Sequence, residues 1–368
     1  MKKILILTRH AYPNYGSILQ AHSLQLFLEN NGFEAKILNY QNKPEKSWRQ
    51  GFSSLKNSKM NQGFIKKAIY LLIQIPNFYI MDKYFSKFRE SLLNMTQEYN
   101  SIEELEKADL MTDILCTGSD QVWNTINQKL DPVYFWNFID SRDKKIISYG
   151  SSLGTNNVPN PIKEEMKHYL KKFNNISVRE KSGYEILKGM GINSETVVDP
   201  VMLMTEDYWQ KFSNSNIVEK NYILVYQLHD NQLFTKCLNT IKDNNPELRL
   251  IRLSPDLKSL KYGKECRVLL HPKEFLSYLK KADFIVTDSF HGTVFSLIFK
   301  KRFATILPPK NDARNRDLLK LFNLEDRIIN SQDNVGSVNE VIDFNNVSKV
   351  MQSLREDSIN KLFSMIQE

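Results

Sequence analysis

Residues 283–299, DFIVTDSFHGTVFSLIF, join an apolar strand pattern to a helical pattern through one short polar turn. The β-branched run ends at Asp288, and Gly292 lets the chain turn sharply before the helical residues begin. Similar strand, loop and helix units alternate along the whole chain. This alternation predicts an α/β fold built on mostly parallel sheets.

The same pattern predicts strands in both halves of the chain. We expect them at 3–7, 34–40, 113–118, 145–150, 175–180 and 195–200, and then at 222–228, 248–253, 283–288 and 302–307. Helices are expected at 18–32 and near 231–244, 273–281, 292–300, 314–322 and 346–366. The pattern restarts after Pro200, which predicts two Rossmann-like domains, residues 1–205 and 206–368, that face each other across a cleft. The closing helix fits a place on either domain.

Positive charge is concentrated in residues 43–90, where ten Lys or Arg against three acids account for +7 of the net charge of +8. The same segment holds the apolar stretch AIYLLIQIPNFYI at 68–80. This combination suits contact with an anionic membrane surface, but a helical insertion that packs on the body is slightly favoured. The three cysteines lie far apart, no nucleic-acid-binding motif is present, and no apolar run reaches the ~18 residues of a membrane span. We therefore expect a cytoplasmic protein that binds no nucleic acid, either free or peripheral at the inner face of the membrane.

Polar side chains follow several strands of the first domain, at the edge where open parallel sheets bind ligands. Asn14, Tyr15 and Gly16 precede the first helix, whose free N–H groups can hold an anion or be satisfied by a simple helix cap. Ser151 lies in a loop of small residues, which either lets a ligand approach closely or is merely flexible. Arg179 ends an apolar strand, where a guanidinium can grip a carboxylate or phosphate; a local ion pair is the alternative.

The loop at 118–124, GSDQVWN, combines hydrogen-bonding side chains with a large aromatic ring. Asp120, Gln121 and Asn124 could bind sugar hydroxyls while Trp123 stacks on the face of the sugar ring. A core tryptophan beside a helix cap explains the same residues equally well.

The turn at 288–293 is the candidate site of the second domain. His291 stands beside the positive end of a helix, where an imidazole can act as an acid or base near neutral pH. The helix start, with Ser289, Gly292 and Thr293, can hold a phosphate. A capping histidine, with Asp288 bonded to backbone, is an equally good explanation of the turn.

Cations crowd the start of the next helix, at Lys310, Arg314 and Arg316, where they oppose the helix dipole. A bound anion would explain this placement, and we favour Arg314 as its partner; solvent-facing pairs with Asp312 and Asp317 are the alternative. The sequence has no HExxH, clustered Cys/His or DxD pattern, so no metal is expected.

Taken in order, these motifs resemble the polysaccharide pyruvyl transferase family. The resemblance covers most of the chain, through NYGSILQAHSLQLFL (14–28), TGSDQVWN (117–124), SVREKSG (177–183), VVDPVML (197–203), TDSFHGTVFSLIFKK (287–301) and ARNRDLLKLFNLEDR (313–327). It implies a two-domain fold like that of GT-B glycosyltransferases. It also implies that a carboxyethylidene (pyruvyl ketal) group is transferred from phosphoenolpyruvate to a sugar, with no cofactor. The basic segment 43–90 has no counterpart among these motifs.

The resemblance further implies roles for the candidate residues. His291 matches the catalytic histidine, Arg179 matches an arginine that grips the donor, and Arg314 matches an arginine near the donor site. Proton transfer from the sugar hydroxyls would then fall to Asp120 or Asp288. We expect the donor on the second domain, with Ser289, Gly292 and Thr293 assisting.

The acceptor would bind on the side of the first domain. We expect a sugar of a cell-surface polysaccharide or of its lipid-linked precursor, bound through Asn14, Tyr15, Gly16, Gln121, Trp123, Asn124 and Ser151. Two other functions compete with this one: a GT-B glycosyltransferase that uses a nucleotide-sugar, and a non-catalytic sugar-binding module.

Overall fold

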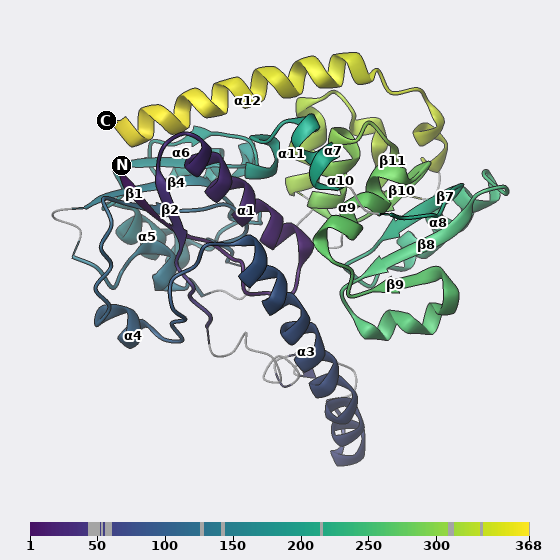
Figure 1. Cartoon of the computed structure of the whole chain (residues 1–368), viewed down its shortest axis with the longest axis horizontal. Coiled ribbons are helices and arrows are strands. Elements are labelled where there is room, and N and C mark those ends of the chain that lie inside the picture. The colour runs from purple at the N-terminus through teal and green to yellow at the C-terminus, as the bar shows by residue number, and fades with distance from the viewer. Residues whose placement is uncertain are drawn as a thin grey trace.

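Apolar runs form the strands of two parallel sheets in this computed structural model (Figure 1). The structure describes residues 1–42, 52, 54–55, 61–125, 129–140, 144–213, 216–307, 313–331 and 334–367. Helices pack on both faces of each sheet. The predicted α/β fold with two Rossmann-like bodies is therefore confirmed.

The first sheet has six strands in the order β2-β1-β3-β4-β5-β6. Their bounds are β1 Lys3–Leu7, β2 Glu34–Ile37, β3 Ile114–Thr117, β4 Lys145–Ser151, β5 Asn175–Val178 and β6 Glu195–Thr196. Ile6 of β1 pairs with Ile37 of β2 on one side and with Cys116 of β3 on the other. The strand order therefore changes direction between β1 and β3, and open α/β sheets bind ligands beside such a point.

The second sheet repeats this design in the order β12-β11-β10-β7-β8-β9. Its strands are β7 Tyr222–Tyr226, β8 Arg249–Ser254, β9 Cys266–Val268, β10 Phe284–Thr287, β11 Arg302–Ile306 and β12 Ile328–Ile329. The order changes direction between β7 and β10, which are neighbours. The edge strands β9 and β12 were not predicted, because three and two residues are too few to show a periodic pattern.

Alternate residues of each strand face opposite layers of helices. On the first sheet, one layer holds α1 (Tyr15–Asn30) and α12 (Phe344–Gln367), and the other holds α5 (Asn160–Leu170) and α6 (Lys181–Gly189). On the second sheet, α9 (Pro272–Lys281) and α10 (Phe290–Ile298) cover one face, and α8 (Gln232–Asp243) covers the other. The shorter elements are α4 (Ile102–Glu106), α7 (Glu206–Phe212), α11 (Ala313–Leu321) and the 3₁₀ turns Pro132–Phe135, Pro200–Met202, Leu257–Glu265, Glu325–Arg327 and Val335–Asn339.

One apolar cluster runs without interruption through both bodies. At its centre Tyr15 of α1 stacks on Phe275 of α9, with ring centroids 4.3 Å apart and ring planes at 11°. This contact explains why loops from both sheets are held against each other.

The closing helix α12 runs across the top of both bodies in Figure 1 and bonds to the first one. The Val198 N–H donates to Ser358 Oγ at 3.0 Å, and Lys361 Nζ donates to the Thr196 carbonyl at 3.1 Å. The chain thus returns to its first half at the end. The predicted domain limits, 1–205 and 206–368, stay a prediction.

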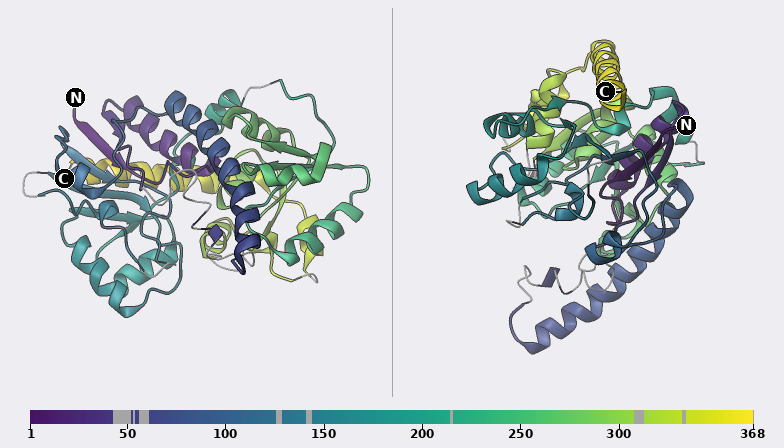
Figure 2. Two further views of the ribbon diagram at one scale, coloured as in Figure 1. Left: turned by 90° about the horizontal axis from the view of Figure 1, so that it is seen from below. Right: turned by 90° about the vertical axis from the view of Figure 1, so that its left-hand side faces the viewer.

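Helix α3 (Phe64–Leu92) projects from the body as a long arm (Figures 1 and 2). Its second half buries Met81, Phe85 and Phe88, whereas Phe64 and Leu72 in its first half are 86% and 74% exposed. The rest of the basic segment, residues 43–60 except 52, 54 and 55, lies outside the described residues. Of the helices that the structure describes, none combines the length and apolarity of a bilayer-crossing segment.

Candidate active site

The two bodies meet where α1 and α10 begin. Helix α1 follows β1, and α10 follows β10. Each of these strands lies at the point where the strand order of its sheet changes direction. His291, in the first turn of α10, lies against Gly16 in the first turn of α1. A Cβ added to Gly16 would lie only 2.1 Å from His291 Nδ1, so only glycine leaves room for this ring. The predicted residues Gly16 and His291 are thus brought together from opposite halves of the chain.

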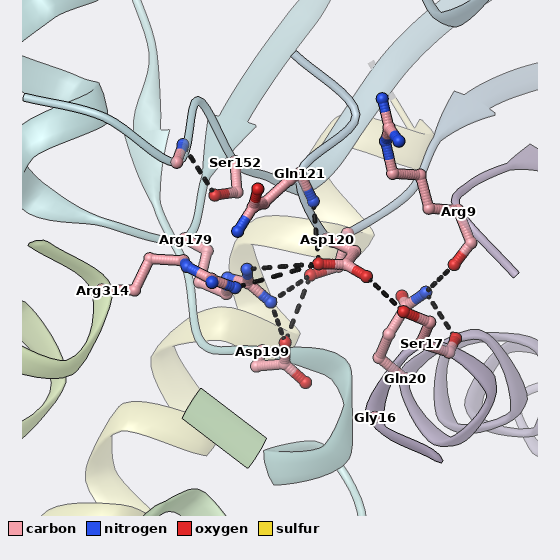
Figure 3. Close-up of polar contacts among 12 residues, drawn as sticks. Arg9, Gly16, Ser17, Gln20, Asp120, Gln121, Ser152, Arg179, Asp199 and Arg314 are labelled. Atoms are coloured by element: carbon pink, nitrogen blue, oxygen red, sulfur yellow. Dashed lines mark hydrogen bonds and ion pairs between the residues drawn. The ribbon is translucent and has the colours of Figure 1, made fainter. Parts of the chain in front are cut away.

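Asp120 is the centre of a polar cluster at this junction (Figure 3). Its Oδ2 accepts a hydrogen bond from Ser17 Oγ at 2.7 Å, and its Oδ1 lies 3.8 Å from Arg179 Nη2 and 4.0 Å from Arg314 Nη1. Burial alone would raise the pKa of Asp120, but Arg179, His291 and Arg314 outweigh it and lower the pKa. Asp120 also adopts a positive φ of 72°, which is uncommon for an aspartate and directs its carboxylate into the cluster.

Arg179, at the end of β5, is fixed by buried carboxylates. Its Nη1 donates to Asp199 Oδ2 at 2.5 Å and its Nε donates to Glu180 Oε1 at 3.1 Å. The guanidinium also covers the Phe290 ring at 4.4 Å. Burial lowers the pKa of Arg179, but the surrounding carboxylates outweigh this effect and raise it. Its Nη2 is buried and makes no hydrogen bond among the described residues; its contact there is the long ion pair with Asp120 Oδ1 at 3.8 Å.

Asp199 links the arginine to His291. The Nε2 of His291 lies 3.6 Å from Asp199 Oδ2, and this buried nitrogen has no hydrogen-bond partner within the described part of the chain. Burial would raise the pKa of Asp199, but His291 and Arg179 lower it, so the carboxylate stays ionised. The Val201 N–H holds the other carboxylate oxygen at 3.0 Å.

Arg314, near the start of α11, completes the cluster. Burial and then the charge of Arg179 lower its pKa, and Asp120 offsets them only in part. When the Gln121 carboxamide turns its oxygen toward Arg314, that oxygen accepts from Nε at 3.3 Å and from Nη1 at 3.1 Å. The guanidinium lies 5.7 Å from the Phe290 ring that Arg179 also covers, so both cations share one aromatic ring. Of the other predicted cations at this helix, Lys310 lies outside the described residues, together with Asp312.

The loops after β1 and β3 are locked by residues that sequence reasoning missed. Thr8 Oγ1 donates to the Ser119 carbonyl at 2.6 Å, and Gln20 Nε2 donates to Thr8 Oγ1 at 2.9 Å. Ser119 Oγ in turn donates to Asp199 Oδ2 at 3.3 Å. These bonds fix the loop that carries Asp120.

Asp199 was also missed, although it lies in the quoted VVDPVML motif. The sequence predicted a strand at 195–200, but β6 ends at Thr196 and Asp199 caps a 3₁₀ turn instead. An acid next to a proline, just beyond an apolar run, was the signal that could have identified it.

Asp288, the other candidate base, bonds to the loop after β7 and not to this cluster. Its buried carboxylate accepts from the Leu228 N–H at 2.7 Å, from the His229 N–H at 2.8 Å and from His229 Nδ1 at 3.1 Å. These bonds tie the end of β10 to the loop after β7. With every side-chain oxygen engaged and no exposed surface, Asp288 is placed to hold the turn and not to exchange protons with a substrate.

The predicted donor contacts on the same turn are also used inside the fold. Ser289 Oγ caps α10 by accepting from the Gly292 N–H at 3.3 Å. Thr293 Oγ1 donates to the Ser289 carbonyl at 3.1 Å and lies 2.8 Å from Thr305 Oγ1. A Cβ on Gly292 would lie 2.4 Å from Thr287 Oγ1, so this glycine serves close packing on β10. The Ser289 and Thr293 side chains thus bond within the fold, and their role in donor binding stays a prediction.

Two predicted acceptor contacts, Trp123 and Ser151, are likewise engaged inside the fold. Trp123 is fully buried, stacks on Phe135 with centroids 5.6 Å apart and donates its Nε1–H to the Tyr134 carbonyl at 3.4 Å. Ser151 is also fully buried, and its Oγ donates to the Gly118 carbonyl at 3.1 Å. Trp123 is the core tryptophan of the alternative interpretation.

Of the remaining acceptor candidates, Tyr15 lies in the core, whereas Asn14, Gln121 and Asn124 are partly exposed. Tyr15 is buried in the shared apolar cluster and offers no face to a sugar, which corrects its assignment. Asn14 caps α1 by accepting from the Gly16 N–H at 2.8 Å, but it also lines a cavity. Gln121 and Asn124 are partly exposed beside Arg314 and stay candidates.

A cavity of about 460 Å³ adjoins the cluster and is lined by Arg179, Glu180, Asp199, Phe290 and Arg314, together with residues of α6, α11 and α12. Its size suits a small ligand. Within the described residues, no group of three or more His, Cys, Asp or Glu is arranged to hold a metal ion.

The chain was compared with known proteins. The model of the family described as polysaccharide pyruvyl transferase matches residues 14–308. A search of curated proteins finds no match. Among solved structures, UDP-GlcNAc 2-epimerase from Methanocaldococcus jannaschii, in complex with UDP-GlcNAc and UDP, aligns with a TM-score of 0.51 at 14% identity, over 96% of this chain and 99% of that chain. Arabidopsis thaliana UGT89C1, complexed with UDP-L-rhamnose, aligns with a TM-score of 0.50 at 10% identity, over 99% and 98% of the two chains. At these identities the likeness shows the fold alone, and that fold is GT-B-like as expected.

Proposed function

Because the chain belongs to the polysaccharide pyruvyl transferase family and is therefore a transferase, we propose that it moves a carboxyethylidene group from phosphoenolpyruvate to a sugar. The acceptor we propose is a sugar of a cell-surface polysaccharide or of its lipid-linked precursor. The observation that supports this best is the buried Nε2 of His291, which makes no hydrogen bond among the described residues, lies 3.6 Å from Asp199 and belongs to one cluster with Arg179 and Arg314. An imidazole in such a place is suited to deliver a proton to a bound anion.

The donor carries a carboxylate and a phosphate, so it needs cationic partners. Arg314 is the more available of the two arginines, because its ion pair with Asp120 is long, at 4.0 Å. Arg179 offers its Nη2, whose ion pair with Asp120 is also long, at 3.8 Å, while Asp199 and Glu180 hold the rest of its guanidinium in position. We place the donor in the cavity that both arginines line.

The first chemical step is protonation of the donor. His291, as imidazolium, gives a proton to the methylene carbon of phosphoenolpyruvate, which becomes a methyl group and leaves C2 electrophilic. Ionised Asp199, 3.6 Å from Nε2, pairs with the ring while it carries the proton. A sugar hydroxyl then attacks C2 to form the first C–O bond.

The second step releases phosphate and closes the ketal. Asp120, held ionised by its cationic neighbours, accepts the proton of the attacking hydroxyl. The C2–O bond to phosphate breaks, and a second hydroxyl of the same sugar forms the second C–O bond. Of the two hydroxyl protons, one restores His291 and the other leaves with the phosphate, so atoms and charge balance.

A histidine substitution tests this function. We expect His291→Gln to lower phosphate release from phosphoenolpyruvate about 10²–10⁴-fold in the presence of acceptor, while phosphoenolpyruvate still binds. His168→Gln, on the exposed face of α5, is the matched control and should keep full activity. The acceptor series contains free sugars, nucleotide-sugars and prenyl-diphosphate sugars, and the new methyl group is detected by NMR. Turnover by His291→Gln within about threefold of wild type would refute the assignment.

A ligand screen separates this function from its competitors. Phosphoenolpyruvate should raise the melting temperature of the wild-type protein, because a ligand that binds only the folded state stabilises it. A shift caused by nucleotide-sugars alone would favour a glycosyltransferase. A shift caused by sugars alone would favour a sugar-binding module.

We also propose that the enzyme works at the cytoplasmic face of a membrane, through α3. The exposed apolar residues Ile65 and Leu72 share the helix with exposed lysines at 66, 67, 83 and 87, which suits anionic lipid. We expect the protein to sediment with vesicles of phosphatidylcholine and phosphatidylglycerol but not with phosphatidylcholine alone. Replacing Ile65 and Leu72 with serine should abolish sedimentation, whereas Val341→Ser, at another exposed apolar residue, should not. Equal binding to both vesicle types, or none, would count against the proposal.

A further inference from the structure

A second cavity, of about 620 Å³, lies at the carboxyl ends of β7 and β8. Three parts of the chain line it: Tyr12, Pro13 and Asn14 before α1; Phe78 and Met81 of α3; and residues of the second body between Val225 and Tyr262. It has no residue in common with the cavity lined by the two arginines. Of the site residues predicted above, it contains Asn14, a candidate acceptor contact.

Cations are the most distinctive groups of this cavity. Arg252 lies at the end of β8, and its Nε is buried without a hydrogen-bond partner among the residues that the structure describes. The Arg252 guanidinium covers the Tyr262 ring at 4.3 Å, which holds it in one orientation. Lys258 and Lys261 also line the cavity from the 3₁₀ turn that follows.

Two acids line the same cavity, and one of them is already committed. Asp256 accepts from the Lys258 N–H at 2.8 Å and lies 3.8 Å from Lys258 Nζ. Asp230 is the other acid. The three cations exceed the two acids by one. Because Asp256 is paired with Lys258, Arg252 and Lys261 remain against Asp230 and can bind an anion. Carboxylate, amide and hydroxyl groups beside such cations suit a sugar that carries phosphate.

The cavity borders the catalytic turn from both bodies. Asn14 lines it and caps the first turn of α1, where Gly16 touches His291. His229 also lines it and bonds to Asp288, three residues before His291. A ligand bound there would therefore lie close to the turn that carries His291.

We propose that this cavity binds the diphosphate of the acceptor, a sugar diphosphate, with Arg252 and Lys261 as its partners. The inference rests on the proposed function for the acceptor role, but not for anion binding itself. A nucleotide or a lipid could supply the same diphosphate. The apolar residues Phe78 and Met81 belong to α3, whose far half exposes apolar side chains, so a lipid-borne diphosphate fits this wall better.

Binding measurements on the whole protein test the site. Inorganic pyrophosphate is titrated into wild type, Arg252→Gln, Lys261→Gln and the control Lys264→Gln, an exposed cation of the same 3₁₀ turn that does not line the cavity. We expect Arg252→Gln to weaken pyrophosphate binding about tenfold or more, Lys261→Gln to weaken it about threefold or more, and Lys264→Gln to leave it unchanged. Lys261 is exposed, so its variant stays informative even if Arg252→Gln fails to fold. Equal pyrophosphate affinity in wild type and Lys261→Gln would overturn the proposal.

Two further arms separate this site from the donor site and identify the source of the diphosphate. Phosphoenolpyruvate should not compete with pyrophosphate, and its affinity should not change in Lys261→Gln; mutual competition would overturn the separate site. If phosphoenolpyruvate fails to bind while pyrophosphate binding depends on Arg252, the proposed donor is wrong and the anion site stands. Tighter binding of a short prenyl-diphosphate sugar than of UDP-GlcNAc supports a lipid-borne acceptor, and the reverse order overturns that part of the proposal.

Discussion

A methyl group on Gly16 would occupy the space of the His291 ring. The added Cβ would lie 2.1, 2.4 and 2.7 Å from Nδ1, Cγ and Cε1 of His291, which are the three nearest heavy atoms. To restore an ordinary contact of 3.4 Å, the ring or the start of α1 must move by about 1.3 Å. Such overpacking costs about 1–3 kcal/mol of unfolding free energy. A displacement of about 1 Å at a catalytic group lowers turnover on the order of 10²-fold.

The effect of Gly16→Ala on the unfolding free energy should change sign when the His291 ring is absent. Gly16 lies in the first turn of α1, and alanine stabilises a helical position by about 0.5–1 kcal/mol relative to glycine. In a His291→Ala background, Gly16→Ala should therefore stabilise the protein. The two substitutions should show a coupling energy of about 2 kcal/mol, as expected for residues in direct contact.

Urea denaturation of four proteins measures this coupling: wild type, Gly16→Ala, His291→Ala and the double variant. Phosphate release from phosphoenolpyruvate by Gly16→Ala measures the displacement of the ring. If Gly16→Ala changes the unfolding free energy equally in both backgrounds, the close contact between α1 and His291 does not exist in solution.

Three other outcomes follow from the site. Asp288→Asn should lose about 1–3 kcal/mol of unfolding free energy, since its amide nitrogen cannot accept from the N–H groups of the β7 loop, and should leave the shape of the pH–rate profile unchanged; a shifted profile would restore a proton-transfer role. Trp123→Leu should cost about 2–4 kcal/mol in urea denaturation without changing the acceptor KM, and a tenfold higher KM at unchanged stability would contradict its place in the core. Because the pKa values of Asp120 and Asp199 are lower in the folded protein than in the unfolded chain, the unfolded state binds protons more readily and stability is lost as pH falls below about 4. Asp120→Asn should make this acid-side slope of the urea midpoint shallower, and an unchanged slope would contradict the lowered pKa.

Strands could be predicted from the sequence where the apolar runs were long enough to show a strand pattern. The predicted strands at 3–7, 145–150 and 302–307 match β1, β4 and β11 almost residue for residue, because each lies between helices in a sheet covered on both faces. The edge strands β9 and β12 are too short to show a pattern, and their position depends on the neighbouring strand.

The charged candidates of the site lie together in the structure, whereas several neutral candidates lie inside the fold. Arg179, Asp120, His291 and Arg314 meet because all four follow strand ends or start helices at one junction. Trp123 and Ser151 also follow strand ends, but the sequence does not show whether such a residue is exposed or buried. Its burial depends on which neighbouring loops cover it. Asp199 was missed because its place in the site depends on contacts with Ser119, Arg179 and His291, which lie on three other segments of the chain.

The return of α12 to the first body has a consequence for how the protein matures during synthesis. Ser358 holds the Val198 N–H, and Arg355 donates to the carbonyls of Met202 at 2.8 Å and Met204 at 3.2 Å, so α12 braces the segment that contains Asp199. Domains usually fold as they leave the ribosome, beginning with the N-terminal one. Here the first body can assemble its sheet early, but its Asp199 segment gains these supports only after α12 has been translated. An active site supported in this way is therefore complete only after α12 has been translated and has docked on the first body.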